Sequence, residues 1–152
     1  MDSRKSKNSQ TGSTILLSVK PRFSKLIVGG KKRVEIRRTW PSVPVSFVLI
    51  YESAPTKRIV AIAHVSKVES KAPRPLWEHA KSLGTGLSRA EFLKYLAGKK
   101  MGFAATLEKV NVFERPAAPA RIFKSFTAPQ SFRYLTQLEI EKAWKLFHTM
   151  RM

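Results

Sequence analysis

The sequence predicts one α+β domain built around a small β-barrel with mixed or antiparallel strands. Short β-rich runs dominate the chain, helical segments stand between them, and one helix lies near the end. There is no internal repeat and no strict alternation of strand and helix. A length of 152 residues suits one domain, and 43% hydrophobic residues can fill one core. We expect a flexible basic tail over residues 1–12 and a single domain over residues 13–152.

The first predicted elements are a strand, a short helix and a second strand. Thr14–Val19 is typical of a strand, and Pro21 then opens a helix, since proline is accepted at the first helical position. Gly29 and Gly30 end that helix. Val34 and Ile36 alternate with charged side chains, which predicts a strand over Lys32–Arg38.

Period-two alternation assigns the side chains of this second strand to two faces. Arg33, Glu35 and Arg37 fall on one face. The other face takes the remaining four residues, which are Lys32, Val34, Ile36 and Arg38. We therefore expect Glu35 to stand between two arginines.

The middle of the chain predicts two buried strands and a helix. Ser46–Tyr51 and Arg58–Val68 are almost continuously apolar, as in buried strands, and the turn-like Glu52–Pro55 separates them. Trp40–Pro44 is a stiff proline-containing connection before them. Pro73–Leu83 follows them and predicts a helix.

Two helix starts carry a specific signature in the C-terminal half. Ser88 with Glu91, and Thr136 with Glu139, each form the S/T-x-x-E pattern of a capping box. Gly98 is the expected stop of the first of these helices. Between them we expect a long strand or a bent pair of strands over Met101–Phe113, and a proline- and alanine-rich loop over Arg115–Arg121. The final helix carries one apolar stripe, formed by Ile140, Ala143, Trp144 and Phe147, which favours core packing over base stacking.

Charge is the strongest functional signal in the sequence. Lysine and arginine total 29 against 10 acidic residues, which gives a net charge of +19. Self-repulsion at this charge disfavours the compact state, so a polyanionic partner is the natural compensation. RNA, DNA or an acidic protein would satisfy it. No apolar run reaches the length of a membrane helix and no secretory signal is present, so we expect a cytoplasmic protein with no membrane partner.

The supply of catalytic groups limits the possible chemistries. The chain has no cysteine, its single aspartate is Asp2, and its glutamates are scattered, which argues against a zinc–thiolate site and a two-metal nuclease. His64, His79 and His148 have no metal-ligand spacing, and no P-loop or dinucleotide motif occurs. We expect no metal and no cofactor. A ribonuclease using two of the histidines remains an alternative, because distant residues can meet in space.

The densest basic segment lies between residues 20 and 38, and Glu35 is its only acid. Its cations are Lys20, Arg22, Lys25, Lys31, Lys32, Arg33, Arg37 and Arg38. Glu35 has two interpretations: a carboxylate satisfied by structural ion pairs, or a cleft residue kept ionised by its neighbours that contacts a base or acts as a general base.

The run Gly30-Lys31-Lys32-Arg33-Val34-Glu35-Ile36-Arg37 resembles the G-x-K-x-x-E-x-R motif of the ASCH domain, a branch of the PUA-like superfamily. The flanking segments agree over about residues 14 to 135. The resemblance implies a PUA-like small mixed β-barrel with inserted helices and a C-terminal helix, and work on RNA by binding or cleavage. One similar branch hydrolyses an acetylated cytidine nucleoside with the motif lysine, a threonine at the position of Glu35, and a glutamate before the next helix. This chain keeps only the lysine, Lys32, and residues 82–86 contain no carboxylate.

Three functions follow from these observations. The first is non-catalytic binding of single-stranded or structured RNA, with DNA as a further ligand. In it, Lys20, Lys32, Arg33, Arg37 and Arg38 contact phosphate, Glu35 reads a base edge, and Trp40 or Tyr51 stacks on a base. The second is a metal-independent RNA or nucleoside hydrolase, in which Lys32 stabilises negative charge and Glu35 is the base. The third is a transcription-coregulator or protein-interaction module. The sequence leaves the oligomeric state open.

Overall fold

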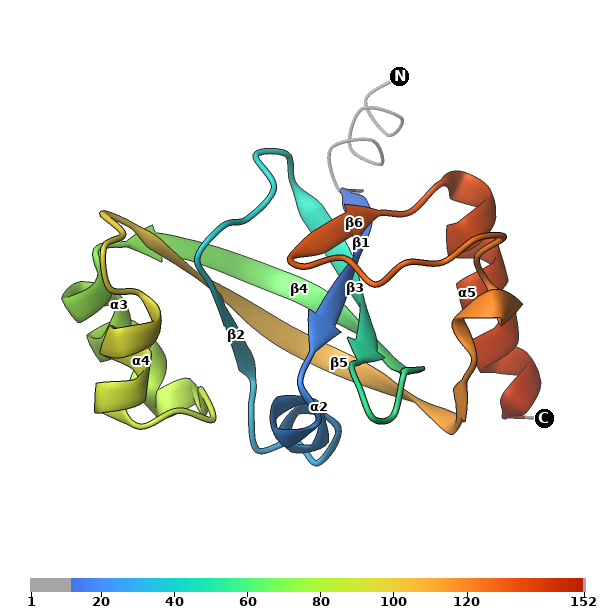
Figure 1. Ribbon diagram of the computed structural model, residues 1–152, viewed down its shortest axis with the longest axis horizontal. Helices are drawn as coiled ribbons and strands as arrows, with labels where there is room; N and C mark the ends of the chain where they lie inside the picture. Colours follow the sequence, from blue (N-terminus) through green and yellow to red (C-terminus); the bar gives the residue numbers. More distant parts are fainter. Residues whose placement is uncertain (1–11, 152) are drawn as a thin grey trace, which may run out of the picture.

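A computed structural model describes residues 12–151, so all but the last residue of the tail expected over residues 1–12 lies outside the described part. Within the described residues, six strands form one sheet in the order β2-β5-β4-β3-β1-β6, with four α-helices around it (Figure 1). The elements are β1 (Ser13–Val19), α2 (Pro21–Val28), β2 (Val34–Arg37), β3 (Val45–Glu52), β4 (Arg58–Lys71), α3 (Pro73–Ala80), α4 (Arg89–Tyr95), β5 (Gly102–Ala117), β6 (Phe132–Tyr134) and α5 (Gln137–Met150). Two 3₁₀ turns span Lys81–Leu83 and Pro119–Arg121.

The sheet is mixed, as the sequence predicted. β1 pairs with β3 in parallel, and the other neighbouring strands are antiparallel. The sheet curls into a half-barrel whose two edge strands are β2 and β6 (Figure 1). This confirms the α+β class with inserted helices and a C-terminal helix.

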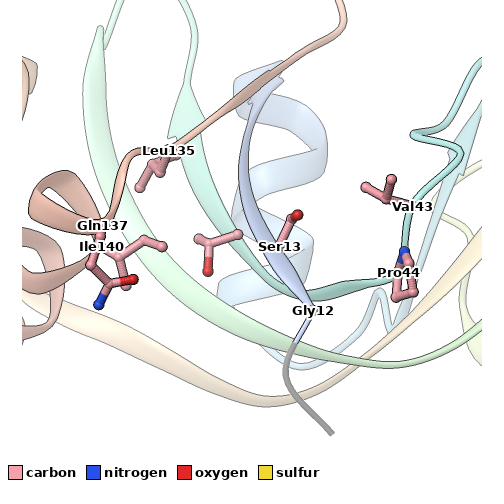
Figure 2. Close-up of a pocket in the computed structure, with 8 residues that line it drawn as sticks. Gly12, Ser13, Val43, Pro44, Leu135, Gln137 and Ile140 are labelled. Carbon is pink, nitrogen blue, oxygen red and sulfur yellow. The ribbon is translucent and has the colours of Figure 1, made fainter. Parts of the chain in front are cut away.

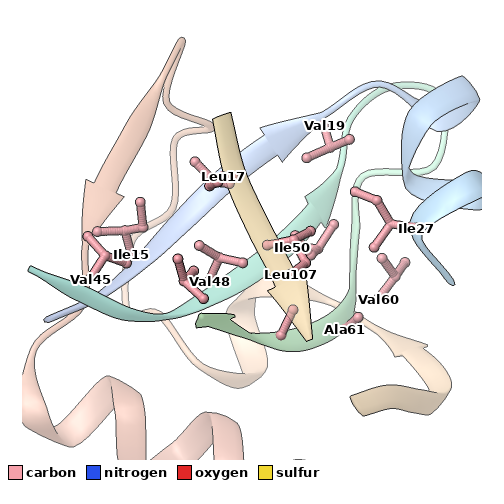
Figure 3. Packing of buried hydrophobic residues seen from close by; sticks show 13 residues of the cluster. Ile15, Leu17, Val19, Ile27, Val45, Val48, Ile50, Val60, Ala61 and Leu107 are labelled. Carbon is pink, nitrogen blue, oxygen red and sulfur yellow. The ribbon is translucent and has the colours of Figure 1, made fainter. Parts of the chain in front are cut away.

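Three apolar clusters hold the helices to the sheet. Inside the curl, Ile27 of α2 packs with alternate residues of four strands, among them Leu17, Ile50 and Leu107 (Figure 3). On the other face, α5 and the segment that follows β5 pack through Phe123 and Phe147. A third cluster places α3 and α4 on β2 and β5; its members are Val34, Ile36, Leu76, Ala80, Phe92, Leu96 and Ala104.

Local signals located the helices well. Both capping boxes are complete: the Ser88 and Thr136 hydroxyls accept from the amides of Glu91 and Glu139, and both carboxylates accept from the cap amides in return. The expected helix over Pro73–Leu83 ends its α-helical part at Ala80 and continues as a 3₁₀ turn. No helix among residues 12–151 is long and apolar enough to cross a bilayer.

The observed strands differ from the predicted ones at several points. β5 continues through Pro116 to Ala117, where a loop was expected, because register shifts along its pairing with β4 accommodate the proline. β6 was not predicted, since three residues show no periodicity. The motif strand begins at Val34 rather than Lys32, which changes the position of Lys32 in the site.

Candidate functional site

A buried ion triad forms the centre of the motif. Glu35, on β2, is only 6% exposed, and its two carboxylate oxygens face different cations. Oε1 lies 3.3 Å from the Lys32 ammonium nitrogen. Oε2 lies 2.6 Å from one terminal nitrogen of Arg37 and accepts from Arg37 Nε at 2.8 Å. Each carboxylate oxygen therefore has a cationic partner within the protein.

Lys32 corrects the expected arrangement of faces. Strict alternation put Lys32 on the face opposite Glu35 and made Arg33 the second cation beside it. Because β2 begins at Val34, Lys32 precedes the strand and its side chain turns back toward Glu35. Arg33 is instead exposed, and its amide donates to the Leu83 and Gly84 carbonyls at 3.1 Å. The triad is thus Lys32–Glu35–Arg37.

Arg37 spans the open side of the half-barrel. From edge strand β2, its guanidinium donates to the Ser18 carbonyl on β1 at 2.8 Å and to the Ser131 carbonyl at 3.4 Å. Ser131 immediately precedes β6, the opposite edge strand. Beside this contact, the Thr39 and Ser131 hydroxyl oxygens lie 3.1 Å apart. Hydrogen bonds from side chains therefore link the β2 side of the half-barrel to β1 and to the start of β6, strands with which β2 forms no backbone pairing.

The link between the 3₁₀ turn and α4 completes the surroundings of Lys32. The Lys32 ammonium donates to the Val34 carbonyl at 2.8 Å and to the Thr85 carbonyl. With Glu35, these acceptors match the three donors of a protonated amine. Gly84 allows this link to pack directly on the backbone of Lys31, because a Cβ at position 84 would lie 2.2 Å from the Lys31 carbonyl oxygen.

The charge states follow from burial and from these neighbours. Burial alone would raise the pKa of Glu35, but the charges of Arg37 and Lys32 outweigh it, so the pKa lies below its ordinary value. Burial lowers the pKa of Lys32, and the charge of Glu35 opposes that effect. The triad therefore holds an ionised carboxylate between the guanidinium of Arg37 and the amine of Lys32, and the three acceptors around that amine favour its protonated form.

Outside the triad, the same segment presents exposed cations. Lys20, Lys25, Lys31, Arg33 and Arg38 are all exposed, and none forms an ion pair with an acid within residues 12–151. Arg38 is held in place by bonds to the Tyr95 carbonyl at 2.6 Å and the Ala97 carbonyl at 3.3 Å, both at the end of α4. Arg22 differs, because its guanidinium is bound to Glu91.

The two candidate stacking residues lie in different environments. Trp40 follows β2, is half-buried and packs on the edge of the inner core cluster. Tyr51 is 5% exposed, and its ring lies 5.0 Å from that of Phe126 on the other face of the sheet. Their stacking roles stay predictions.

Three residues of this site were not found from the sequence: Ser18, Thr85 and Ser131. The backbone carbonyls of Ser18 and Ser131 accept from Arg37, and that of Thr85 accepts from Lys32. A carbonyl is common to every residue, so no pattern of side chains signals it. Only the tertiary fold brings these segments to the motif.

A surface pocket lies elsewhere on the fold. It is lined by the start of β1, by Val43 and Pro44, and by Leu135 and Ile140 near α5 (Figure 2). None of the predicted site residues lines it. Among the described residues, no group of three histidine, cysteine, aspartate or glutamate side chains is placed to hold a metal ion.

Comparisons with known proteins agree with this motif and fold. The family model described as "ASCH domain" matches residues 17–116. A curated "ASCH domain-containing ribonuclease" from Zymomonas mobilis is 28% identical over 134 residues, which cover 84% of this chain and 87% of that protein. The crystal structure of ASCH from Zymomonas mobilis has a TM-score of 0.80 and 28% identity, covering 88% of this chain and 95% of that one. Further structures of that protein carry a tyrosine-to-phenylalanine or a serine-to-alanine substitution.

Other relatives are much longer proteins. The "ATP synthase subunit alpha" of Ureaplasma parvum is 26% identical over 122 residues, but the match spans only 15% of its length. The "Large ribosomal subunit protein uL22" of the same organism is 27% identical over 130 residues, which are 41% of its length. The similarity to these two proteins is therefore confined to one part of each.

Proposed function

Because the chain belongs to the ASCH domain family, we propose that it binds RNA through the exposed cations on both sides of the Lys32–Glu35–Arg37 triad. The family match and the ribonuclease relative support an RNA-related function. The charge of +19 adds an independent physical reason, since neutralising phosphates releases counterions from the nucleic acid.

The observation that carries binding rather than catalysis is the pairing of the triad inside the protein. Both oxygens of Glu35 and the ammonium of Lys32 already have partners there, and the Glu35 side chain is only 7% exposed. A general base must reach the substrate proton, and burial between two cations keeps this carboxylate away from it. The triad therefore acts as the support of β2, and Lys20, Lys25, Lys31, Arg33 and Arg38 supply the phosphate contacts.

The salt dependence of RNA affinity tests this proposal. Five phosphate contacts on a single strand predict a slope of about −3.5 in a plot of log affinity against log salt, or about 100-fold weaker binding at 200 mM than at 50 mM salt. Fluorescence anisotropy with labelled single-stranded RNA measures it. A flat salt response would overturn the proposal.

Matched variants locate the binding surface. Arg33→Ala with Arg38→Ala should weaken RNA binding and reduce the magnitude of the slope by about 1.4, because two phosphate contacts are lost. Arg115→Ala with Arg121→Ala removes the same charge at two exposed positions, at the end of β5 and just after it, outside the part of β5 that pairs with β2, and is the control. An equal effect of both changes would mean that net charge alone, rather than this surface, controls affinity. Single-stranded DNA of the same sequence tests discrimination between RNA and DNA.

RNA cleavage is the second candidate, favoured by the relative named as a ribonuclease. In the hydrolase hypothesis, Lys32 stabilises the negative charge that develops on the substrate, and Glu35 acts as the base. Incubation of labelled RNA with the protein and a chelator tests it by gel electrophoresis. Glu35→Gln should then abolish product formation even at a temperature at which circular dichroism shows that this less stable variant is still folded. An intact substrate with the wild-type protein would exclude cleavage.

Two hydroxyl groups of this chain give further variants for the cleavage assay, by the same kinds of substitution, tyrosine to phenylalanine and serine to alanine, that structures of the Zymomonas protein carry. In this chain, Ser131 lies against Arg37 and Thr39, and Tyr51 is paired with Ser18 in the sheet. Tyr51→Phe and Ser131→Ala each remove a single hydroxyl oxygen, so loss of cleavage with retained RNA binding would identify a chemical role.

A further inference from the structure

A row of aromatic rings leads from the sheet to the exposed face of α5. Phe47 on β3 contacts His64 on β4 at 5.4 Å between ring centroids, and it meets Trp144 of α5 edge-on at 5.3 Å. One turn further along α5, the imidazole of His148 stacks on Trp144 at 5.9 Å, with only 25° between the ring planes. His148 is exposed and Trp144 is half-buried. The row therefore ends in a stacked pair at the surface.

Packing against buried aromatic rings holds the Trp144 indole of this pair in place. Phe147 meets Trp144 edge-on at 6.1 Å and lies in the second core cluster with Leu146. Phe47 fixes the indole from the side of the sheet. A ring already immobilised by packing loses little conformational entropy when a further ring stacks on it.

Two cations lie next to this pair on α5 and just after it. Lys145 and Arg151 are exposed, and neither forms an ion pair within residues 12–151. Of the acids on the helix, Glu139 binds Arg133 at 2.9 Å, whereas Glu141 accepts from the neutral amide of Gln137 at 3.2 Å and keeps its charge. A stacking surface beside exposed cations is the combination that single-stranded nucleic acids use.

The location of α5 separates this surface from the motif. α5 packs on the second core cluster, whereas α3 and α4 pack on β2 and β5 at the other end of the molecule (Figure 1). We propose that the Trp144–His148 face of α5, with Lys145 and Arg151, is a second contact for single-stranded RNA. It rests on the proposed function, and it implies that one long strand contacts both the motif surface and α5.

The test compares RNA lengths. A strand of about 25 nucleotides exceeds the site size of a single small module, whereas one of about 5 nucleotides fits within it. His148→Ala combined with Lys145→Glu should weaken binding of the long RNA at least about fivefold, since one stack and one phosphate contact are lost. Lys67→Glu, a charge reversal at an exposed site on β4, is the matched control.

The outcomes separate this inference from the proposed function. If the wild-type protein binds neither RNA, both proposals fail. If it binds and the α5 double variant matches Lys67→Glu, the α5 surface is wrong and the motif surface stands. Photochemical cross-linking adds a positional readout: the long RNA should attach to a peptide of α5, and cross-links confined to residues 20–40 would overturn the α5 contact. The unfolding temperature of each variant confirms that the fold is retained.

Discussion

Glu35 keeps its charge although its side chain is almost completely buried. Two cations within 3.3 Å compensate for the lost hydration, and its low exposure also protects these pairs from screening by salt. The sequence placed a carboxylate among cations, which proved correct. It named the wrong second cation, because alternation applies only inside a strand and Lys32 lies just before one.

Replacing Glu35 should cost the protein much of its stability. Glu35→Gln leaves Lys32 and Arg37 buried without a counter-charge, and removal of one partner from a buried ion pair costs about 3–5 kcal/mol in free energy of unfolding. Urea denaturation measures the loss. Glu114→Gln, at an exposed position on β5, is the control and should change the stability little. Equal stability of the two variants would contradict a structural role for the triad.

The same carboxylate predicts a pH dependence. The pKa of Glu35 is lower in the folded protein than in the unfolded chain, where it is about 4.3. Its contribution is therefore complete above the unfolded pKa and is lost as the pH falls through the lower folded pKa. The stability difference between wild type and Glu35→Gln should be constant near neutral pH and shrink below about pH 4. A stability difference that grows on acidification would mean that folding raises the pKa of Glu35 instead of lowering it.

At the scale of elements, segments distant in sequence determine the geometry of the motif. The link over residues 84–86 supplies the Thr85 carbonyl to Lys32, and Arg22 of α2 binds both Glu91 and the Gly86 carbonyl. This bond to Arg22, together with the hydrogen bonds from Ser88, lowers the pKa of Glu91 to about 2. Caps and periodicity predicted the helices from local sequence alone. The docking of the link could not be predicted, because it depends on backbone contacts.

Gly84 offers a direct test of that docking. Gly84→Ala must adopt a left-handed φ of +79° and place its Cβ against the Lys31 carbonyl, so we expect a loss of at least about 2 kcal/mol. Gly98→Ala is the matched control, with φ +82° but nothing within 4 Å of the added carbon, and should cost about 1 kcal/mol. Denaturation of both variants measures the difference. If the two losses were equal, the close approach at Gly84 would be unimportant.

At the scale of the whole molecule, self-repulsion should limit stability. Most of the 29 lysine and arginine side chains have no acidic neighbour to pair with, since acidic residues number only 10. Salt screens exposed charges over a Debye length of about 10 Å at 0.1 M. The unfolding temperature should therefore rise between about 50 and 500 mM sodium chloride, and scanning calorimetry measures it. A falling temperature would mean that exposed ion pairs outweigh the repulsion.

The pairing of β6 with β1 has a consequence for synthesis of the chain. Leu17 pairs with Phe132 and Ile15 with Tyr134, so a strand made early is completed by one made more than a hundred residues later. During translation, the β6-facing edge of β1 stays unpaired until Phe132–Tyr134 leave the ribosome. Pairing over such separations is slow to form, and an open strand edge attracts other chains. Nascent chains that stop before β6 should therefore depend on chaperones, while chains that include β6 complete the sheet and no longer need them.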